Sequence, residues 1–303
     1  MISTDTKANV IQKGDAAHHG RADPALAVGV LALGWLCAYV AVSAALLAAG
    51  GHWRFVTVHV LVLGASAWAV RSKTSTGEVV RDLLPLFVAP LLYVELPSII
   101  AVLGTGYHDS AIQSFEALVF GDQPSRSLAT RFPWRPASEV LHAGYLAYYV
   151  MIFVPALLLF KRGDRRGFGE LVFALTVTYT ICWVTFVTFP VQGPRYLWPA
   201  PGEMPDGPIR RLAVNILEAG SSRGAAFPSS HMAVATVVAL MSYRWMRTQA
   251  WLWVTIALLV GLGAVYGGFH YGVDVVAGFV LGAAVSFAVI AHSRTTIARD
   301  VAA

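Results

Sequence analysis

Two histidines of this chain lie in sequence patterns that could perform covalent chemistry. In the segment YGGFHYGVD, His270 and Asp274 are four residues apart, so on a helix both side chains lie on one face. The carboxylate can then accept a hydrogen bond from the imidazole, which fixes the tautomer and leaves the other ring nitrogen of His270 free to attack phosphorus. The alternative is a neutral structural histidine that a nearby carboxylate satisfies.

The segment SSRGAAFPSSH, residues 221–231, places the second histidine at the start of a long apolar run. Pro228 fits the first turn of a helix, which leaves Ser229, Ser230 and His231 at the positive N-terminal end. Free backbone N–H groups, two hydroxyls and the helix dipole would suit a phosphate there. The alternative is that the two serines only cap the helix.

The elements that must position these residues are transmembrane helices. The chain is 56% hydrophobic and 13% charged, with a mean hydropathy of +0.61, whereas roughly a quarter of a soluble domain is charged. Windows long enough to cross a bilayer recur at 25–50, 54–70, 83–104, 138–160, 169–190, 230–246, 250–267 and 272–291. We therefore predict an all-α, polytopic transmembrane bundle of about eight spans. Ionisable residues at such positions are usually functional, which favours the chemical interpretation of His270.

The basic residues orient the bundle, because Lys and Arg are retained on the cytosolic side. With the N-terminus inside, all lysines and most arginines fall in cytosolic segments, and the turn KRGDRRG is the strongest indication. The outer segments then hold only arginines, which need a separate explanation: Arg54, Arg126, Arg131, Arg135, Arg195, Arg210, Arg211 and Arg223. The net charge of +5 is assigned to this topology and to anionic lipid headgroups, and no nucleic-acid partner is expected.

The chain divides into four expected parts. Residues 1–24 form a disordered cytosolic tail, 25–80 an N-terminal pair of transmembrane helices, 81–292 a membrane-embedded core, and 293–303 a second cytosolic tail. The outer segments 105–137 and 191–229 each contain an amphipathic stretch, HDSAIQSFEALVFG and IRRLAVNILEAG, which we expect to form short interfacial helices. His231, His270 and Arg195 all fall at outer ends of different spans. A site on the extracytoplasmic face, in the plasma membrane, is therefore predicted.

The two histidine segments resemble motifs of the type 2 phosphatidic acid phosphatase superfamily. The Pro-Ser-Ser-His of residues 228–231 corresponds to the second motif of that family, Pro-Ser-Gly-His. His270 and Asp274 correspond to the end of the third motif, Ser-Arg-x5-His-x3-Asp. The resemblance covers about residues 85–292 and implies a six-helix phosphatase-type core inside the bundle.

The chain departs from the family pattern at basic positions of the first motif, Lys-x6-Arg-Pro, and of the third. The replacements are Thr188 for the lysine, Tyr196 for the proline, and Gly263 and Ala264 for the Ser-Arg pair. Arg195 keeps the arginine of the first motif, and Arg223 is the candidate to compensate for the missing one. These losses, with the segment FGDQPS, are similar to the inositol phosphorylceramide synthase branch, whose members transfer a phospho-headgroup between lipids.

The resemblance and the residue chemistry imply a lipid phosphotransferase that works through a phosphohistidine. His270 would be the nucleophile, held by Asp274, and His231 would protonate the leaving alkoxide and then activate an alcohol such as a lipid or an inositol-type acceptor. Phosphate oxygens would be bound by four side chains: Arg195, Arg223, Ser229 and Ser230. The outer segments show no carboxylate cluster of the kind that binds magnesium, so we expect metal independence and no cofactor.

Other residues and functions stay open at this point. Glu95, in LLYVELPS, could line the cavity, pair with an arginine, or be a protonated structural residue. Tyr145 and Tyr149 lie on one stripe with His142 and could line the cavity or only pack. The alternative enzyme is a hydrolase that releases phosphate from a lipid phosphate or an isoprenyl diphosphate. The alternative of another class is a proton- or phosphate-handling transporter, although no repeated halves are evident.

Overall fold

The computed structural model describes residues 24–198 and 206–302, with side chains between residues 28 and 295 of these ranges. The expected tail 1–24 lies outside the described residues except for Pro24. In the described ranges the chain is all-α, as predicted, and the loops around Val191 and Ala225 meet in one isolated parallel bridge.

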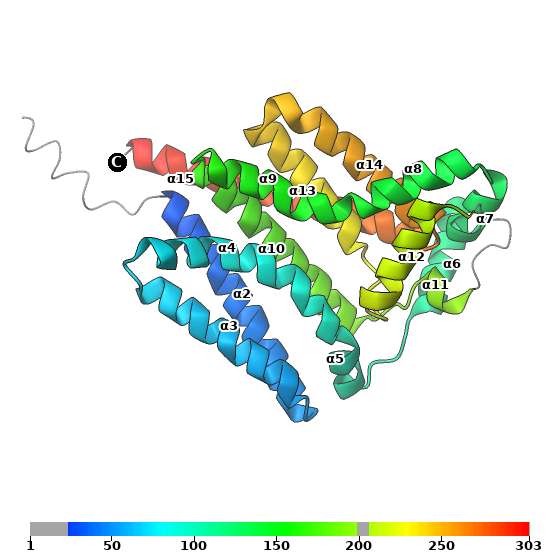
Figure 1. The fold of residues 1–303 in the computed structure, drawn as a ribbon, viewed down its shortest axis with the longest axis horizontal. Coiled ribbons are helices and arrows are strands. Elements are labelled where there is room, and N and C mark those ends of the chain that lie inside the picture. The colour runs from blue at the N-terminus through cyan, green and yellow to red at the C-terminus, as the bar shows by residue number, and fades with distance from the viewer. Residues whose placement is uncertain (1–23, 199–205, 303) are drawn as a thin grey trace, which may run out of the picture.

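Long helices cross the bundle (Figure 1). They are α2 (Pro24–Ala49), α3 (Trp53–Arg71), α4 (Ser75–Leu91) continued by η1 (Leu92–Glu95) and α5 (Leu96–Leu103), α8 (Arg135–Leu146), α9 (Tyr148–Lys161), α10 (Arg165–Thr188), α13 (Ser230–Trp245), α14 (Ala250–Tyr266) and α15 (Gly272–Ala302). Six helical stretches are long and apolar enough to span a membrane, and α8 with α9, bent by 44° at their junction, makes a seventh. The protein is therefore an integral membrane protein. The remaining expected span, 230–246, corresponds to α13. This helix has 16 residues, and most of them are buried in the bundle.

The turns before α4 and α10 begin these helices through polar caps. The Thr74 hydroxyl accepts a hydrogen bond from the Gly77 N–H at 3.2 Å and starts α4. Asp164 accepts from the Gly167 N–H at 2.8 Å and starts α10 directly after the basic turn. Each cap satisfies a backbone N–H that has no partner inside its helix.

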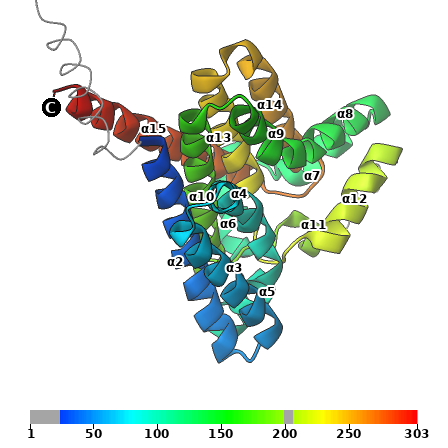
Figure 2. The same ribbon diagram turned by 60° about the vertical axis from the view of Figure 1, so that its left-hand side comes forward.

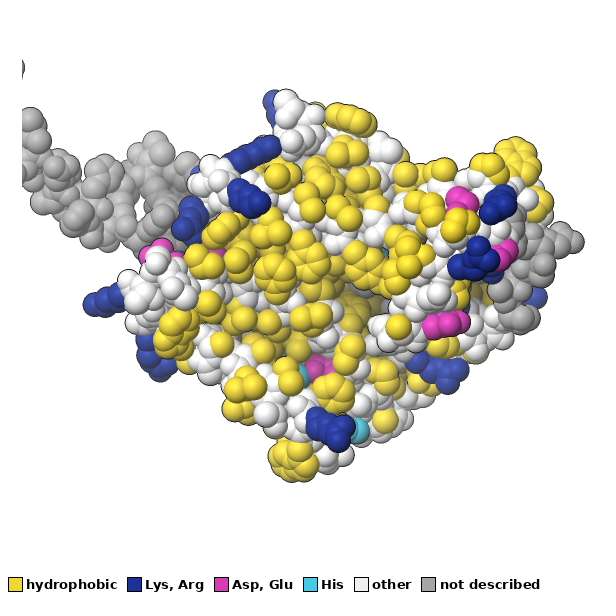
Figure 3. Space-filling model, viewed as in Figure 1, with side chains coloured by type: hydrophobic (Ala, Val, Ile, Leu, Met, Phe, Trp, Pro, Cys, Tyr) yellow, Lys and Arg dark blue, Asp and Glu magenta, His cyan; other side chains and the backbone are white. Residues whose placement is uncertain are grey.

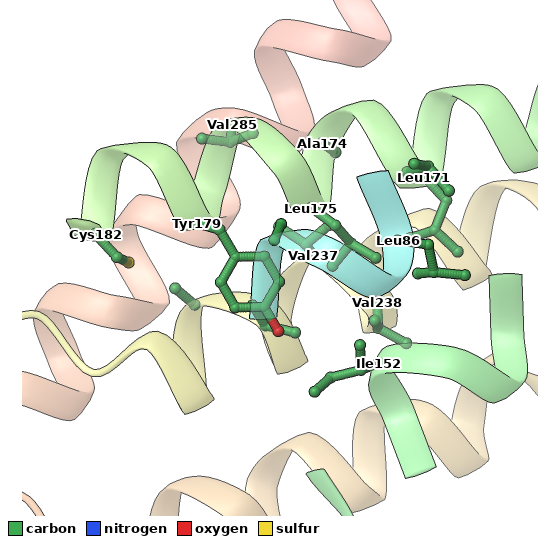
Figure 4. Packing of buried hydrophobic residues seen from close by; sticks show 14 of the residues in the cluster. Leu86, Ile152, Leu171, Ala174, Leu175, Tyr179, Cys182, Val237, Val238 and Val285 are labelled. Atoms are coloured by element: carbon green, nitrogen blue, oxygen red, sulfur yellow. The ribbon is translucent and has the colours of Figure 1, made fainter. Parts of the chain in front are cut away.

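Helix α10 lies at the centre of the bundle and packs against α2, α13, α4 and α15. Figure 4 shows Leu175 and Tyr179 of α10 beside Val237 of α13 and Ile152 of α9, all of them almost fully buried. Because lipid tails are as apolar as these side chains, close van der Waals packing holds the helices together. This core fixes α13, the helix that carries His231.

Glycines bring α13 and α15 into backbone contact. A Cβ atom built on Gly278 would lie 2.3 Å from the Ser229 carbonyl oxygen, and one on Gly282 would lie 2.3 Å from that of Ala233. The four-residue spacing places both glycines on the face of α15 that meets α13, as small residues do at helix contacts in membranes. The close approach sets the start of α15 against the start of α13.

Short helices gather at the end of the bundle opposite the described chain ends (Figures 1 and 2). They are α6 (Asp109–Phe120), α7 (Pro124–Arg131), α11 (Pro194–Leu197) and α12 (Pro208–Gly220). Helix α6 forms within the first amphipathic stretch expected from the sequence, and α12 covers the second, beginning one residue before it. At the other end, Glu170 bonds Arg244 at 3.0 Å and Arg166 at 3.1 Å. Figure 3 shows hydrophobic side chains over the middle of this face, with Lys and Arg toward its ends.

Candidate functional site

His270 lies in the loop between α14 and α15 and is only 4% exposed. Its Nδ1 lies 3.0 Å from the carbonyl oxygen of Ala226 and 3.6 Å from Oδ2 of Asp274. Because a carbonyl oxygen only accepts hydrogen bonds, the Nδ1 proton is directed at Ala226 and the lone pair is left on Nε2. A backbone oxygen therefore orients the ring at shorter range than the expected carboxylate does.

Asp274 is fully buried in the first turn of α15. Its Oδ2 accepts a hydrogen bond from the Tyr271 N–H at 2.8 Å, which fixes the turn that carries His270. The carboxylate thus contacts both the backbone of this loop and, at longer range, the imidazole.

His231 lies in the first turn of α13 and faces His270. The two imidazole rings are 5.5 Å apart between centroids, at an angle of 62°. The Tyr145 ring stacks on His231 at 4.9 Å, and the Tyr145 hydroxyl lies 3.1 Å from Nε2 of His231. The Nδ1 atom of His231 is buried without a hydrogen-bond partner among the residues that the structure describes. One group bound between the rings would be within reach of both.

Both histidines line a cavity of about 150 Å³, which we call the histidine cavity. Of the residues singled out in the sequence, it brings together His231, His270, Arg195, Ser230, Tyr145 and Tyr149. Since a water molecule takes roughly 30 Å³ of liquid, this volume suits a phosphoryl group and a few neighbouring atoms.

Other candidates lie away from the cavity wall. The Ser229 hydroxyl accepts from the Met232 N–H at 3.3 Å and caps α13, so the capping interpretation describes it. Glu95 is 2% exposed and pairs with His59 of α3, Oε2 to Nε2, at 3.1 Å. The expectation that Glu95 lines the cavity or pairs with an arginine is thus not met, because α3 packs a histidine against it.

Arg195 reaches the cavity from α11 through a loop that Asp109 holds. The two carboxylate oxygens of Asp109 accept from the N–H groups of Gln192 and Gly193, each at 2.9 Å. One of them also accepts from the Tyr271 hydroxyl at 3.2 Å. Asp109 therefore ties α6 to the Arg195 loop and to the His270 loop at once. No sequence pattern marks Asp109, because only the folded loops bring these groups together.

Tyr196 organises both candidate arginines. The guanidinium carbon of Arg195 lies 5.0 Å from the Tyr196 ring centroid, and that of Arg223 lies 5.1 Å from it. The Tyr196 hydroxyl is 2.7 Å from the Ser221 hydroxyl, to which Arg195 Nη1 donates at 3.2 Å. Arg223 is exposed and does not line the histidine cavity. Tyr196, which replaces the family proline, thus contacts both Arg195 and Arg223.

The structure also accounts for the absence of the Ser-Arg pair before His270. At the position of that pair, a Cβ atom built on Gly263 would lie 2.2 Å from the carbonyl oxygen of Leu141. Helix α8 packs there directly against α14, and this contact leaves no space for a side chain on Gly263. The same packing places Tyr145 of α8 over His231.

In the described part of the chain, no group of three or more His, Cys, Asp or Glu side chains is arranged to hold a metal ion. The groups positioned at the histidine cavity are imidazoles, hydroxyls and a guanidinium, side chains that can form hydrogen bonds to phosphate oxygens.

Comparison with known proteins agrees with the motif resemblance. A family model described as the PAP2 superfamily matches residues 111–289, more than half of the chain. Among curated proteins, the bacitracin transport permease protein BcrC of Bacillus licheniformis is 34% identical over 56 residues. That alignment covers 18% of this chain and 28% of the length of the curated relative. No solved structure matches.

Proposed function

We propose that the chain, which belongs to the PAP2 superfamily, transfers the phospho group of a lipid phosphoester to an alcohol through a phosphohistidine. Enzymes of this superfamily act on lipid phosphates and are generally metal-independent. The observation that carries this proposal is the pair of histidine rings, buried His270 and half-buried His231, which lie 5.5 Å apart in one cavity. Of these two histidines, His270 is the one with its Nδ1 directed at a backbone carbonyl, at 3.0 Å, which leaves Nε2 as the nucleophile.

The reaction divides into two displacements. In the first, the Nε2 lone pair of His270 forms the bond to phosphorus, the bond to the alcohol oxygen breaks, and His231 gives a proton to the leaving alkoxide. In the second, His231 takes the proton of the acceptor hydroxyl, the acceptor oxygen bonds phosphorus, and the nitrogen–phosphorus bond breaks. The Tyr145 hydroxyl, 3.1 Å from Nε2, orients His231 for both proton transfers.

Positive charge and hydrogen-bond donors stabilise the transferring group. Arg195 lines the histidine cavity and, with Ser230 at the start of α13, faces the place where the non-bridging oxygens would lie. Asp274 supports this arrangement by holding the His270 loop, and Ser229 supports it by capping α13. Arg223 would act at the outer side of Tyr196.

Replacement of His270 tests the nucleophile. His270→Ala removes the attacking nitrogen, so cleavage of any lipid phosphate by the purified protein should fall at least about a thousandfold. Wild-type protein stopped in mid-turnover with ³²P-labelled substrate should carry an acid-labile, base-stable phosphate that the variant lacks. His52→Ala, in the turn between α2 and α3 and away from the cavity, is the matched control. Activity of His270→Ala near the wild-type level would refute the mechanism.

Hydrolysis is the second candidate function. A larger cavity, of about 660 Å³, shares Arg195 and Phe269 with the histidine cavity and is lined by charged and hydroxyl-bearing side chains, which would let water approach the phosphohistidine. Incubation of the purified protein with labelled phosphatidic acid, an isoprenyl diphosphate or phosphatidylinositol, with and without alcohols, separates the two. Acceptor-dependent lipid products support transfer, whereas free phosphate alone supports hydrolysis. The relative whose name includes transport permease motivates a third assay, and phosphate uptake into vesicles without cleavage would favour transport.

A further inference from the structure

A larger cavity of about 660 Å³ adjoins the histidine cavity, and Arg195 and Phe269 line both. Small-molecule sites usually occupy about 300–1,000 Å³, so the larger cavity falls in that range, whereas the histidine cavity, at about 150 Å³, does not. A polar group attached to the reacting phosphate, or approaching it, therefore has its space on the far side of Arg195.

Three of the outer arginines that the charge topology left unexplained line this larger cavity. They come from three short helices: Arg126 from α7, Arg195 from α11 and Arg210 from α12. The sequence separates them widely, and only the fold gathers them. Guanidinium groups bind phosphate oxygens in pairs of parallel hydrogen bonds, which makes such a cluster suited to a phosphate.

Each of these arginines keeps unused hydrogen-bonding capacity. Arg126 lies over the Trp198 ring at 4.7 Å, and within the described ranges it pairs with no carboxylate. Arg195 donates to the Ser221 hydroxyl and has no ion pair among the same residues. Arg210 reaches Asp206 only at 3.4 Å, and its Nε is buried with no partner in the described part of the chain.

Two carboxylates line the larger cavity against three arginines, so they do not fully neutralise this cluster. Asp122 lines the cavity but is bonded to Arg131 at 2.7 Å, and Arg131 lies outside the lining. Glu218 is the other lining carboxylate and is exposed on α12. The cavity therefore carries an excess of cationic donors, which favours an anionic ligand.

We propose that the larger cavity is a subsite for a second phosphate group, bound by Arg126 and Arg210, while the reacting phosphate lies at His270. This inference rests on the proposed function for the identity of the first phosphate. The second phosphate is carried either by the same lipid, as a diphosphate, or by a phosphorylated acceptor. In both cases it lies beyond Arg195, on the side away from the two histidines.

Binding tests the subsite without turnover. The probe is methylenediphosphonate, a diphosphate analogue whose P–C–P bridge cannot be hydrolysed, titrated into the purified full-length protein in a calorimeter. Arg126→Gln and Arg210→Gln should each weaken its Kd about tenfold, because each loses a charge-assisted contact. Arg211→Gln is the matched control, because Arg211 bonds the same Asp206, at 3.3 Å, but does not line the cavity. Unchanged Kd values for both test variants would overturn the proposal.

Activity ratios then identify the source of the second phosphate. If it belongs to the lipid, Arg126→Gln and Arg210→Gln lower the ratio of kcat/KM for farnesyl diphosphate to that for farnesyl monophosphate about tenfold. If it belongs to an acceptor, the same variants lower the ratio of transfer to glycerol 3-phosphate over transfer to glycerol. A ratio cancels the fraction of folded enzyme, so a partly unstable variant stays informative. If neither ratio changes in the two variants, the subsite proposal is wrong. If the wild-type protein binds the diphosphonate but turns over no lipid phosphate, the proposed function is wrong and the subsite is not affected.

Discussion

At the scale of single residues, the two histidines receive different roles from their surroundings. His270 is oriented by a backbone carbonyl at 3.0 Å, whereas His231 lies under the ring of Tyr145 and is bonded by its hydroxyl at 3.1 Å. A carbonyl fixes which nitrogen of His270 carries the proton, while a hydroxyl can either donate to or accept from His231. The first environment suits a nucleophile, and the second suits a group that must both give and take a proton.

The two candidate arginines provide a residue-scale prediction. Arg195 lines both cavities, whereas Arg223 is exposed and contacts the ring of Tyr196 at the edge of the site. Arg195→Gln should therefore lower kcat/KM for a lipid phosphate by about 10²-fold, and Arg223→Gln by about tenfold or less. Steady-state kinetics of the two variants beside wild type measure the difference. Equal losses would mean that Arg223 turns inward when substrate binds.

How far the site could be predicted also depends on the residue. His231, His270 and Arg195 could be grouped from the sequence, because each falls at the outer end of an apolar run and topology brings those ends together. Asp109 and the Ala226 carbonyl could not, because each acts through a backbone contact between distant loops that leaves no pattern in the sequence. Arg223 could be proposed only from its nearness to residues 228–231 along the chain. In the fold, Arg223 lies against Tyr196, and it is Tyr196 that lines the histidine cavity.

At the scale of elements, α6 fastens the two loops of the site through acidic side chains. Asp109, at its first turn, holds the Arg195 loop, and Glu116, two turns later, accepts from the Gly272 N–H at 3.0 Å at the start of α15. The amphipathic pattern of this segment predicted a helix lying in the interface. The pattern could not show that its polar face points inward to hold other loops.

The buried Glu116 makes stability depend on pH. Burial raises the pKa of its carboxyl from 4.5 to about 7, because loss of hydration outweighs the hydrogen bond from Gly272. Between these values the folded state binds more protons than the unfolded state. The contribution to stability is therefore full below about pH 4.5 and is lost as the pH rises through about 7.

Glu116→Gln should abolish this dependence, since an amide keeps the acceptor for Gly272 and does not ionise. Between pH 5 and pH 8, the Tm of the wild-type protein in detergent should fall by a few degrees more than that of the variant. Differential scanning fluorimetry measures the two curves. Glu78→Gln, at an exposed position in the first turn of α4, serves as the control and should follow wild type. Parallel curves for Glu116→Gln and wild type would show that the carboxyl is not the titrating group.

At the scale of the whole molecule, the two ends of the bundle differ in chemistry. One end carries the basic turns and the network of Glu170 with Arg166 and Arg244. The other carries the short helices, both cavities and outer basic residues that are all arginines. Lysines and most arginines are retained on the cytosolic side, so the cavities should open to the extracytoplasmic side. Three of the arginines on that side, Arg126, Arg195 and Arg210, line the larger cavity, so ligand binding can account for their presence away from the cytosolic side.

Cysteine labelling tests this orientation. In a background without Cys37 and Cys182, which lie inside spans, Ser114→Cys would place a thiol on exposed α6, and Ser75→Cys would place one at the turn between α3 and α4. A membrane-impermeant maleimide added to intact cells should label the first variant and not the second, because only the α6 end faces outward. Lysed cells should label both variants, which controls for accessibility of the thiols. Labelling of Ser75→Cys alone in intact cells would invert the topology and place the phosphate chemistry on the cytosolic leaflet.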